Sequence, residues 1–144
     1  MKTILLLTIS LLIHRPESYG QQTSIISGID SIASKIDSVK NLSVTIVDGQ
    51  FRPKGKGKWA GYSDCYYRDS ASTKLLRVVH GQGKYNPGVT TYYFLNDNLI
   101  LVRMENAQFY FQDGKFILKL GTEGRDEQAK YFLQNAVRYL MDDK

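Results

Sequence analysis

The sequence is short of the side chains that bind metal ions. It has one cysteine and two histidines in 144 residues, and only His80 of the two histidines lies beyond residue 20. A structural zinc site takes about four nitrogen or sulfur ligands, and the carboxylates show no calcium-loop spacing. The composition therefore predicts a protein with neither a metal site nor a cofactor.

Cysteine is also too scarce for a framework of disulfide bonds. Cys65 stands alone, so no bridge can form within the chain. A free thiol in an oxidising compartment is buried, paired with another chain, or reactive, and burial is the commonest fate. A hydrophobic core must hold the fold, and residues 21–144 are enough to build one.

The sequence lacks an apolar run long enough for a transmembrane helix, which needs roughly 20 residues. Its N-terminal apolar segment covers only residues 4–13; Lys2 precedes this segment, and the tripeptide Ser-Tyr-Gly, which ends at Gly20, follows it. This order is typical of a signal peptide and its cleavage site. We expect residues 1–20 to be removed and residues 21–144 to form a single exported domain, in the periplasm or outside the cell. A retained membrane anchor is the alternative.

Aromatic and β-branched residues are abundant in the second half of the chain. Three such runs occupy residues 90–120, and turn-forming residues separate them. The Asp-Gly pair at 113–114 is the strongest turn signal, because a type I′ turn needs positive φ at both central positions. This turn predicts that Phe111 lies opposite Phe116 on a buried face, with Tyr110 on the other face.

Two further strand pairs follow from the same reasoning. The Asp-Gly turn predicts Phe109 opposite Leu118, and a turn closing at residues 106–107 predicts Val102 opposite Phe111. Together these pairs extend the buried face of Phe111 and Phe116 to a third strand, the one that contains Val102.

The register of the strand at residues 92–95 stays open. The Asn-Asp-Asn segment at 96–98 closes as either a two-residue or a three-residue loop. The two loops differ by one residue in register, so they place the side chains of residues 92–95 on opposite faces of the sheet. Both faces of the preceding strand carry apolar side chains, so the hydrophobic pattern does not decide between them.

Periodic spacing defines the remaining elements. Apolar residues recur every three or four positions over residues 21–40 and again over residues 126–141, which predicts two amphipathic helices. Further strand patterns lie at residues 42–46, 59–69 and 74–80. We therefore predict an α+β fold: an antiparallel β-meander of six or seven strands, with the N-terminal and C-terminal helices packed on one face.

One pair of side chains has the chemistry of a nucleophile and its base. Cys65 and His80 fall on neighbouring predicted strands, and Asp64 or Asp69 is available to orient the imidazole. A small secreted hydrolase is the function that such a pair would serve. Cysteines in strands ordinarily pack as small apolar residues, so this enzyme is the alternative to a binding function.

The chain is modestly basic, with a formal net charge of +5, and four of its cations lie close together at residues 52–58, which we expect to form a surface loop. Lys54, Lys56 and Lys58 alternate with glycine in this loop. Such a loop can hold a polyanion of the cell envelope by charge alone. The alternative is a solvated surface loop that binds no ligand. Nothing in the chain indicates specific binding of nucleic acid.

Tyrosines form the second candidate ligand surface. The chain has ten tyrosines, and several fall in strands where they must face away from helices packed on one face. Tyrosine suits a half-wet surface, because its ring contributes contact area while its hydroxyl keeps a polar partner. The alternative is that cross-strand tyrosines only stabilise the sheet. The candidates are Tyr62, Tyr66, Tyr92 and Tyr110.

The aromatic hairpins resemble a known unit. Residues 92–100 read Tyr-Tyr-Phe-Leu-Asn-Asp-Asn-Leu-Ile, and residues 109–117 read Phe-Tyr-Phe-Gln-Asp-Gly-Lys-Phe-Ile. Together they resemble a repeated hairpin unit of small exported bacterial proteins of unknown function. The resemblance implies an antiparallel sheet with a flanking helix, and it brings neither an activity nor site residues.

The tyrosines and the basic loop, rather than this resemblance, indicate a function. We expect a non-enzymatic binding or interaction module of the cell envelope, whose partner is an envelope polyanion or another protein. The sequence leaves the partner's identity and the oligomeric state open.

Overall fold

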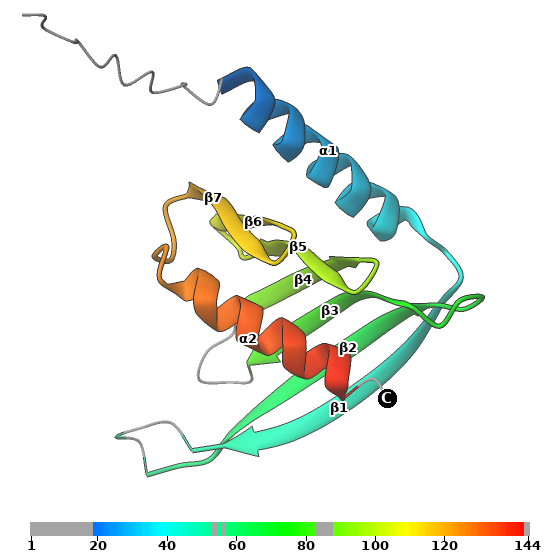
Figure 1. The fold of residues 1–144 in the computed structure, drawn as a ribbon. Coiled ribbons are helices and arrows are strands. Elements are labelled where there is room, and N and C mark those ends of the chain that lie inside the picture. The colour runs from blue at the N-terminus through cyan, green and yellow to red at the C-terminus, as the bar shows by residue number, and fades with distance from the viewer. Residues whose placement is uncertain (1–18, 53–54, 56, 83–87, 143–144) are drawn as a thin grey trace, which may run out of the picture.

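The computed structural model describes residues 19–52, 55, 57–82 and 88–142. Over these residues the chain runs through one helix, seven strands and a second helix (Figure 1). These elements are α1 (Tyr19–Ser38), β1 (Leu42–Phe51), β2 (Ala60–Asp69), β3 (Leu75–Gln82), β4 (Val89–Leu95), β5 (Asn98–Arg103), β6 (Ala107–Gln112), β7 (Lys115–Gly121) and α2 (Gln128–Met141). The strands pair in chain order in one antiparallel sheet, so the predicted α+β meander is confirmed.

The predicted signal peptide falls almost wholly outside the described residues. Tyr19 is the first described residue and also the first residue of α1. Of the two helices that the structure describes, neither is long and apolar enough to cross a membrane.

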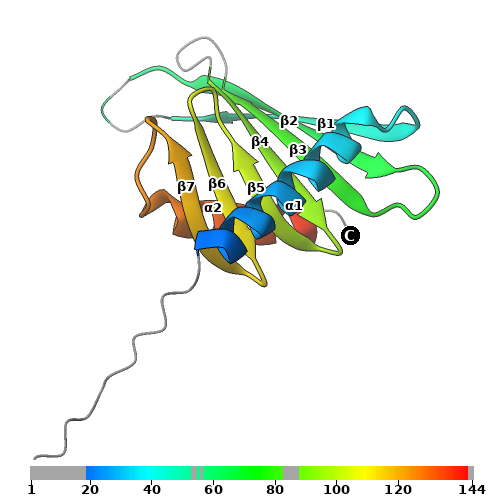
Figure 2. The same ribbon diagram turned by 90° about the horizontal axis from the view of Figure 1, so that it is seen from above.

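The two helices lie on opposite faces of the sheet, so the prediction that both pack on one face is wrong. Figure 2 shows α1 across one side of the strands and α2 behind them. The middle of the sheet explains this arrangement, because residues 99–102 of β5 are all buried. A strand that is apolar on both faces needs a cover on each.

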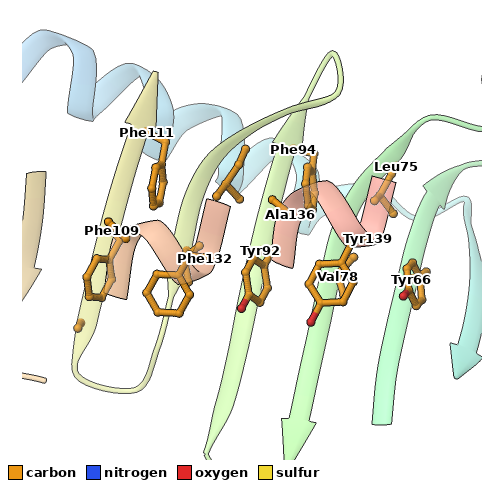
Figure 3. Packing of buried hydrophobic residues seen from close by; sticks show 14 residues of the cluster. Tyr66, Leu75, Val78, Tyr92, Phe94, Phe109, Phe111, Phe132, Ala136 and Tyr139 are labelled. Atoms are coloured by element: carbon orange, nitrogen blue, oxygen red, sulfur yellow. The ribbon is translucent and has the colours of Figure 1, made fainter. Parts of the chain in front are cut away.

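α2 covers the larger of the two cores, which Figure 3 shows from close by. The Phe132 ring lies 4.9 Å from the Phe109 ring and meets it edge to face. The Tyr139 ring meets Tyr92 in the same way at 5.1 Å. Such edge-to-face pairs add to the stabilisation that burial of the rings provides, so α2 is fixed over β2–β6.

α1 covers the second core on the other face. Two carboxylates on α1 also accept hydrogen bonds from tyrosines of the sheet: Asp30 from the Tyr110 hydroxyl at 3.0 Å, and Asp37 from the Tyr93 hydroxyl at 3.1 Å. Arg77 of β3 adds an ion pair with Asp37 at 2.6 Å. The apolar side chains of Ile29, Ala33 and Ile36 pack α1 onto the sheet. The hydrogen bonds and the ion pair add polar contacts that fix the position of the helix.

Two-residue turns close two of the hairpins. Both residues of the 113–114 turn have positive φ, 51° and 72°, and Phe111 lies opposite Phe116, as predicted. The turn at 96–97 also has positive φ at both positions, 49° and 59°. This geometry is that of a type I′ turn. It shows that the 96–98 segment closes as the two-residue loop, which was one of the two registers that the sequence left open.

The remaining register predictions are wrong by small shifts. A β-bulge just before Phe111 puts Phe109 opposite Lys119 instead of Leu118. The turn between β5 and β6 sets Val102 opposite Phe109 rather than Phe111. Val102 and Phe109 nevertheless share the α2 face, so the predicted buried face is right although the individual pairs are not.

Candidate functional site

Cys65 and His80 lie on opposite faces of the sheet. Cys65 on β2 is opposite Val79 on β3, whereas His80 is opposite Asp64. Neighbouring residues of a strand point to opposite faces, so the thiol and the imidazole do not share a site. The predicted nucleophile and base are therefore separated, and Cys65 is a partly exposed free thiol.

His80 contacts Asp64 instead. Its Nδ1 donates to Asp64 Oδ1 at 2.5 Å, and the Asp64 residue is only 3% exposed. Arg138 of α2 lies on the other side of the carboxylate, with Nη2 3.8 Å from Oδ2. Burying a carboxylate costs folding free energy unless the charge is paired and hydrogen-bonded. The His80 and Arg138 side chains therefore offset the cost of burying Asp64.

Asp69, the other predicted orienting carboxylate, is engaged elsewhere. It accepts hydrogen bonds from the Ser72 hydroxyl and from the backbone amides of Ala71 and Ser72 in the turn after β2. The Ser72 hydroxyl is the main reason why the pKa of Asp69 lies below its usual value. Asp69 therefore fixes a turn and does not orient His80.

An aromatic row continues from the His80 side chain along the same face. The Tyr62 ring lies 5.8 Å from the His80 ring and 6.4 Å from the Phe51 ring. Tyr62 also lies directly over Gly49, where a Cβ atom would overlap its ring. Glycine at that position therefore allows the tyrosine to lie flat against β1.

Three of the four candidate tyrosines are buried, which corrects the prediction of a half-wet tyrosine face. Tyr66 is 4% exposed, and Tyr92 and Tyr110 are each 1% exposed. Desolvation is the main reason why the pKa of each is raised, to about 12 for Tyr110. The prediction failed because helices cover both faces of the sheet. Tyr62 is the one of the four that stays partly exposed.

The basic segment between β1 and β2 lies at the same end of the sheet. Arg52 and Lys58 are exposed, and the neighbouring Trp59 is 62% exposed. The other two predicted ligand lysines, Lys54 and Lys56, lie outside the described residues. In Figure 1 this end of β1 extends beyond α2, so that helix does not cover it.

These features lie at the same end of the sheet, which we name the loop-end surface. It consists of Phe51, Arg52, Lys58, Trp59, Tyr62 and His80. A hollow of about 630 Å³ lies at the same end of the sheet and is lined by Asp48, Gly49, Gln50, Gly61, Tyr62, Ser63 and Gly81. The strand pairing places Asp48, Gln50, Gly61, Ser63 and Gly81 on the face opposite the aromatic row, so the hollow and the row lie on different sides of the sheet. The glycines leave this part of the sheet bare: a Cβ on Gly61 or Gly81 would meet a single backbone oxygen, 3.8 Å away.

Two residues that build the site do not stand out in the sequence. Gly49 follows Asp48 and reads as part of a tight turn or a bulge, whereas it lies within the continuous pairing of β1 with β2. Arg138 reads as a solvated position of an amphipathic helix. Only the register of β1 against β2, together with the packing of α2, would have revealed their roles.

The fold and the site together define a two-helix α+β meander protein with an aromatic and cationic surface at one end of its sheet. Among the described residues, no group of three or more histidine, cysteine, aspartate or glutamate side chains could hold a metal ion. No family model, curated protein or solved structure matches the chain.

Proposed function

We propose that this chain is an exported binding module of the cell envelope that holds an anionic polymer on its loop-end surface. The observation that carries the proposal is the exposure of Trp59, Arg52 and Lys58 at the end of the β1–β2 hairpin where the aromatic row also ends, at the pair Phe51 and Ala60. An envelope anion such as lipopolysaccharide presents phosphate groups for the cations and sugar rings for the aromatic side chains.

Charge and contact area favour this ligand chemistry together. Exposed cations raise the local concentration of a polyanion and speed its association. Exposed aromatic rings then supply contact area at a low cost in conformational entropy, while Tyr62 keeps a hydroxyl for a polar partner. A surface with cations alone would attract anions without positioning them.

The aromatic row is held rigidly, which suits a binding surface. His80 is held by buried Asp64, and Tyr62 lies between the His80 and Phe51 rings. A ligand that contacts these rings does not have to order them first, so less affinity is lost to entropy.

A hydrolase that uses Cys65 and His80 is not proposed, because the two side chains lie on opposite faces of the sheet. The resemblance of the hairpins to exported bacterial proteins agrees with an envelope location, and export itself remains part of the proposal.

The test is a titration of purified protein with lipopolysaccharide at low and high salt. We expect binding that weakens as salt rises, because counterions compete with the two cations. The double variant Arg52→Gln/Lys58→Gln should bind about 30-fold more weakly, since each cation near an anionic surface contributes about 1 kcal/mol. Lys130→Gln, an exposed cation on α2, is the matched control and should bind like the wild type. Equal binding by the double variant and the control would remove the proposal.

A further inference from the structure

β1 is an open edge of the sheet. The strand order places β1 and β7 at the two edges, and β1 pairs with β2 along its whole length, from Leu42 to Phe51. No strand in the described part of the chain pairs with its other side. The backbone donors and acceptors on that side are therefore available to another strand.

The two edges differ in how they are protected. β7 carries Lys115 and Lys119, and the Lys119 ammonium donates to the carbonyl of Gly124. β1 contains no lysine, arginine or proline, and its single charged residue is Asp48. Natural edge strands commonly use lysine or proline to prevent pairing with other chains, so β1 has the composition of a strand that accepts a partner.

Apolar side chains are exposed on both faces of β1. Val44 is 49% exposed and Ile46 is 61% exposed, on one face, and Val47 is 44% exposed on the other. Val44 and Ile46 point to the α1 side of the sheet, but the core beneath α1 is built on β4, β5 and β6. Neither helix therefore buries the exposed side chains of β1.

The sequence of β1 is complementary to itself. In an antiparallel pair with Thr45 opposite Thr45 of a second copy, Val44 of each copy lies opposite Ile46 of the other. Asp48 then lies diagonally across from Lys40 of the second copy, within reach of the lysine side chain. A shift that sets Ile46 opposite itself would instead place Asp48 against Val44 on both sides.

We propose that two copies of this chain associate edge to edge through β1, in the register that sets Thr45 opposite Thr45, so that the sheet continues from one copy into the other. The pairing satisfies the open backbone groups and covers Val44 and Ile46 of both copies. It leaves both helices outside the interface, and it stands independently of the ligand proposed above.

Sedimentation velocity of the purified protein over a range of concentrations tests the association. The monomer mass is 16.4 kDa for the whole chain, and we expect a species of about twice the monomer mass as concentration rises. Ile46→Lys should sediment as a monomer, because it places a charge in the middle of the shared edge. Val44→Lys provides a second variant at an exposed position, in case the first disturbs folding. Val137→Lys, at a position of α2 that is 51% exposed, is the control and should still dimerise.

Disulfide trapping tests the register. In a Cys65→Ala background, Thr45→Cys should form an intermolecular disulfide on mild oxidation, because residues directly opposite each other have Cα atoms about 4.5–5.5 Å apart, within disulfide range. Val47→Cys should remain reduced, because it does not face itself. Cross-linking through Ile46→Cys in place of Thr45→Cys would overturn the register.

Two results would overturn the association itself. One is a protein that stays monomeric up to its solubility limit, which would leave β1 as an edge for a strand of a different protein. The other is a dimer that Ile46→Lys, Val44→Lys and Val137→Lys all leave intact, which would place the contact on another surface.

Discussion

The imidazole of His80 and the carboxylate of Asp64 lie 2.5 Å apart on neighbouring strands, and the carboxylate is almost fully buried. Arg138 approaches the same carboxylate from α2. Asp64 therefore links three elements, β2, β3 and α2, at the point where the core ends and the loop-end surface begins. Its loss should affect both stability and the position of the His80 ring.

Asp64→Ala should lower the free energy of unfolding by about 1.5–3 kcal/mol, the range for hydrogen bonds to charged groups. The variant leaves His80 and Arg138 without their shared partner. Urea denaturation measures the effect, with Glu105→Ala as the control, because Glu105 is exposed in the turn between β5 and β6. The control should stay within about 0.5 kcal/mol of the wild type. Equal stability of the two variants would show that the buried contact contributes little.

Gly49→Ala should destabilise the protein by about 1–3 kcal/mol, because the added methyl group overlaps the Tyr62 ring and forces it to move. In a Tyr62→Ala background the same change should cost much less, since the ring is no longer there. A double-mutant cycle of denaturant melts measures this coupling. Additive effects of the two changes would mean that Tyr62 does not lie over Gly49 in solution.

Export predicts that protein recovered from the periplasm or the medium lacks residues 1–20. Cleavage there would remove only Tyr19 and Gly20 from α1, so the contacts of α1 with the sheet would remain. Intact-mass spectrometry decides the point. Gly20→Leu, which places a large residue at the cleavage site, should retain the segment. A wild-type mass that includes residues 1–20 would remove the prediction.

Local signals in the sequence were sufficient for the elements and the main turns. The Asp-Gly pair at 113–114 determines its own turn, because the demand for positive φ is local. Helical spacing identified both helices for the same reason. The β-bulge before Phe111 has no such signal, and each bulge moves the pairs beyond it.

The placement of α1 could not be predicted, because it depends on contacts between residues far apart in the chain. Asp30 accepts a hydrogen bond from the Tyr110 hydroxyl, and Asp37 accepts one from the Tyr93 hydroxyl. In the sequence Tyr110 looks like the exposed side of a sheet covered on one face, and the face of Tyr93 stays open. The structure shows that they form the second core, and their hydroxyls reach α1 carboxylates at its margin.

Phe111→Ala and Tyr110→Ala should therefore be about equally damaging, each by roughly 3–5 kcal/mol, the range for truncating a buried aromatic ring. The sequence alone predicts only about 1 kcal/mol for Tyr110→Ala, as for an ordinary surface position. Tyr110→Phe keeps the ring and loses the hydrogen bonds to Asp30 and Gln108, so it should cost about 1.5–3 kcal/mol, the range for hydrogen bonds to charged groups. Denaturant melts of the three variants measure these differences. A small loss of stability for Tyr110→Ala would mean that the Tyr110 ring is exposed in solution.

The Tyr110 hydroxyl also predicts how stability changes in alkali. Burial and the neighbouring Asp30 carboxylate raise its pKa from 10.0 to about 12 in the folded protein. The unfolded chain therefore loses this proton first, so the stability that the hydroxyl contributes is complete below pH 10 and is lost as pH rises towards 12. Tyr110→Phe cannot ionise, and its difference in unfolding free energy from the wild type should shrink between pH 10 and pH 12. Tyr131→Phe, at a ring that is 55% exposed, is the control, and its difference from the wild type should stay constant. A constant difference for Tyr110→Phe as well would mean that Tyr110 ionises alike in the folded and unfolded chains, and that α1 does not hold its hydroxyl.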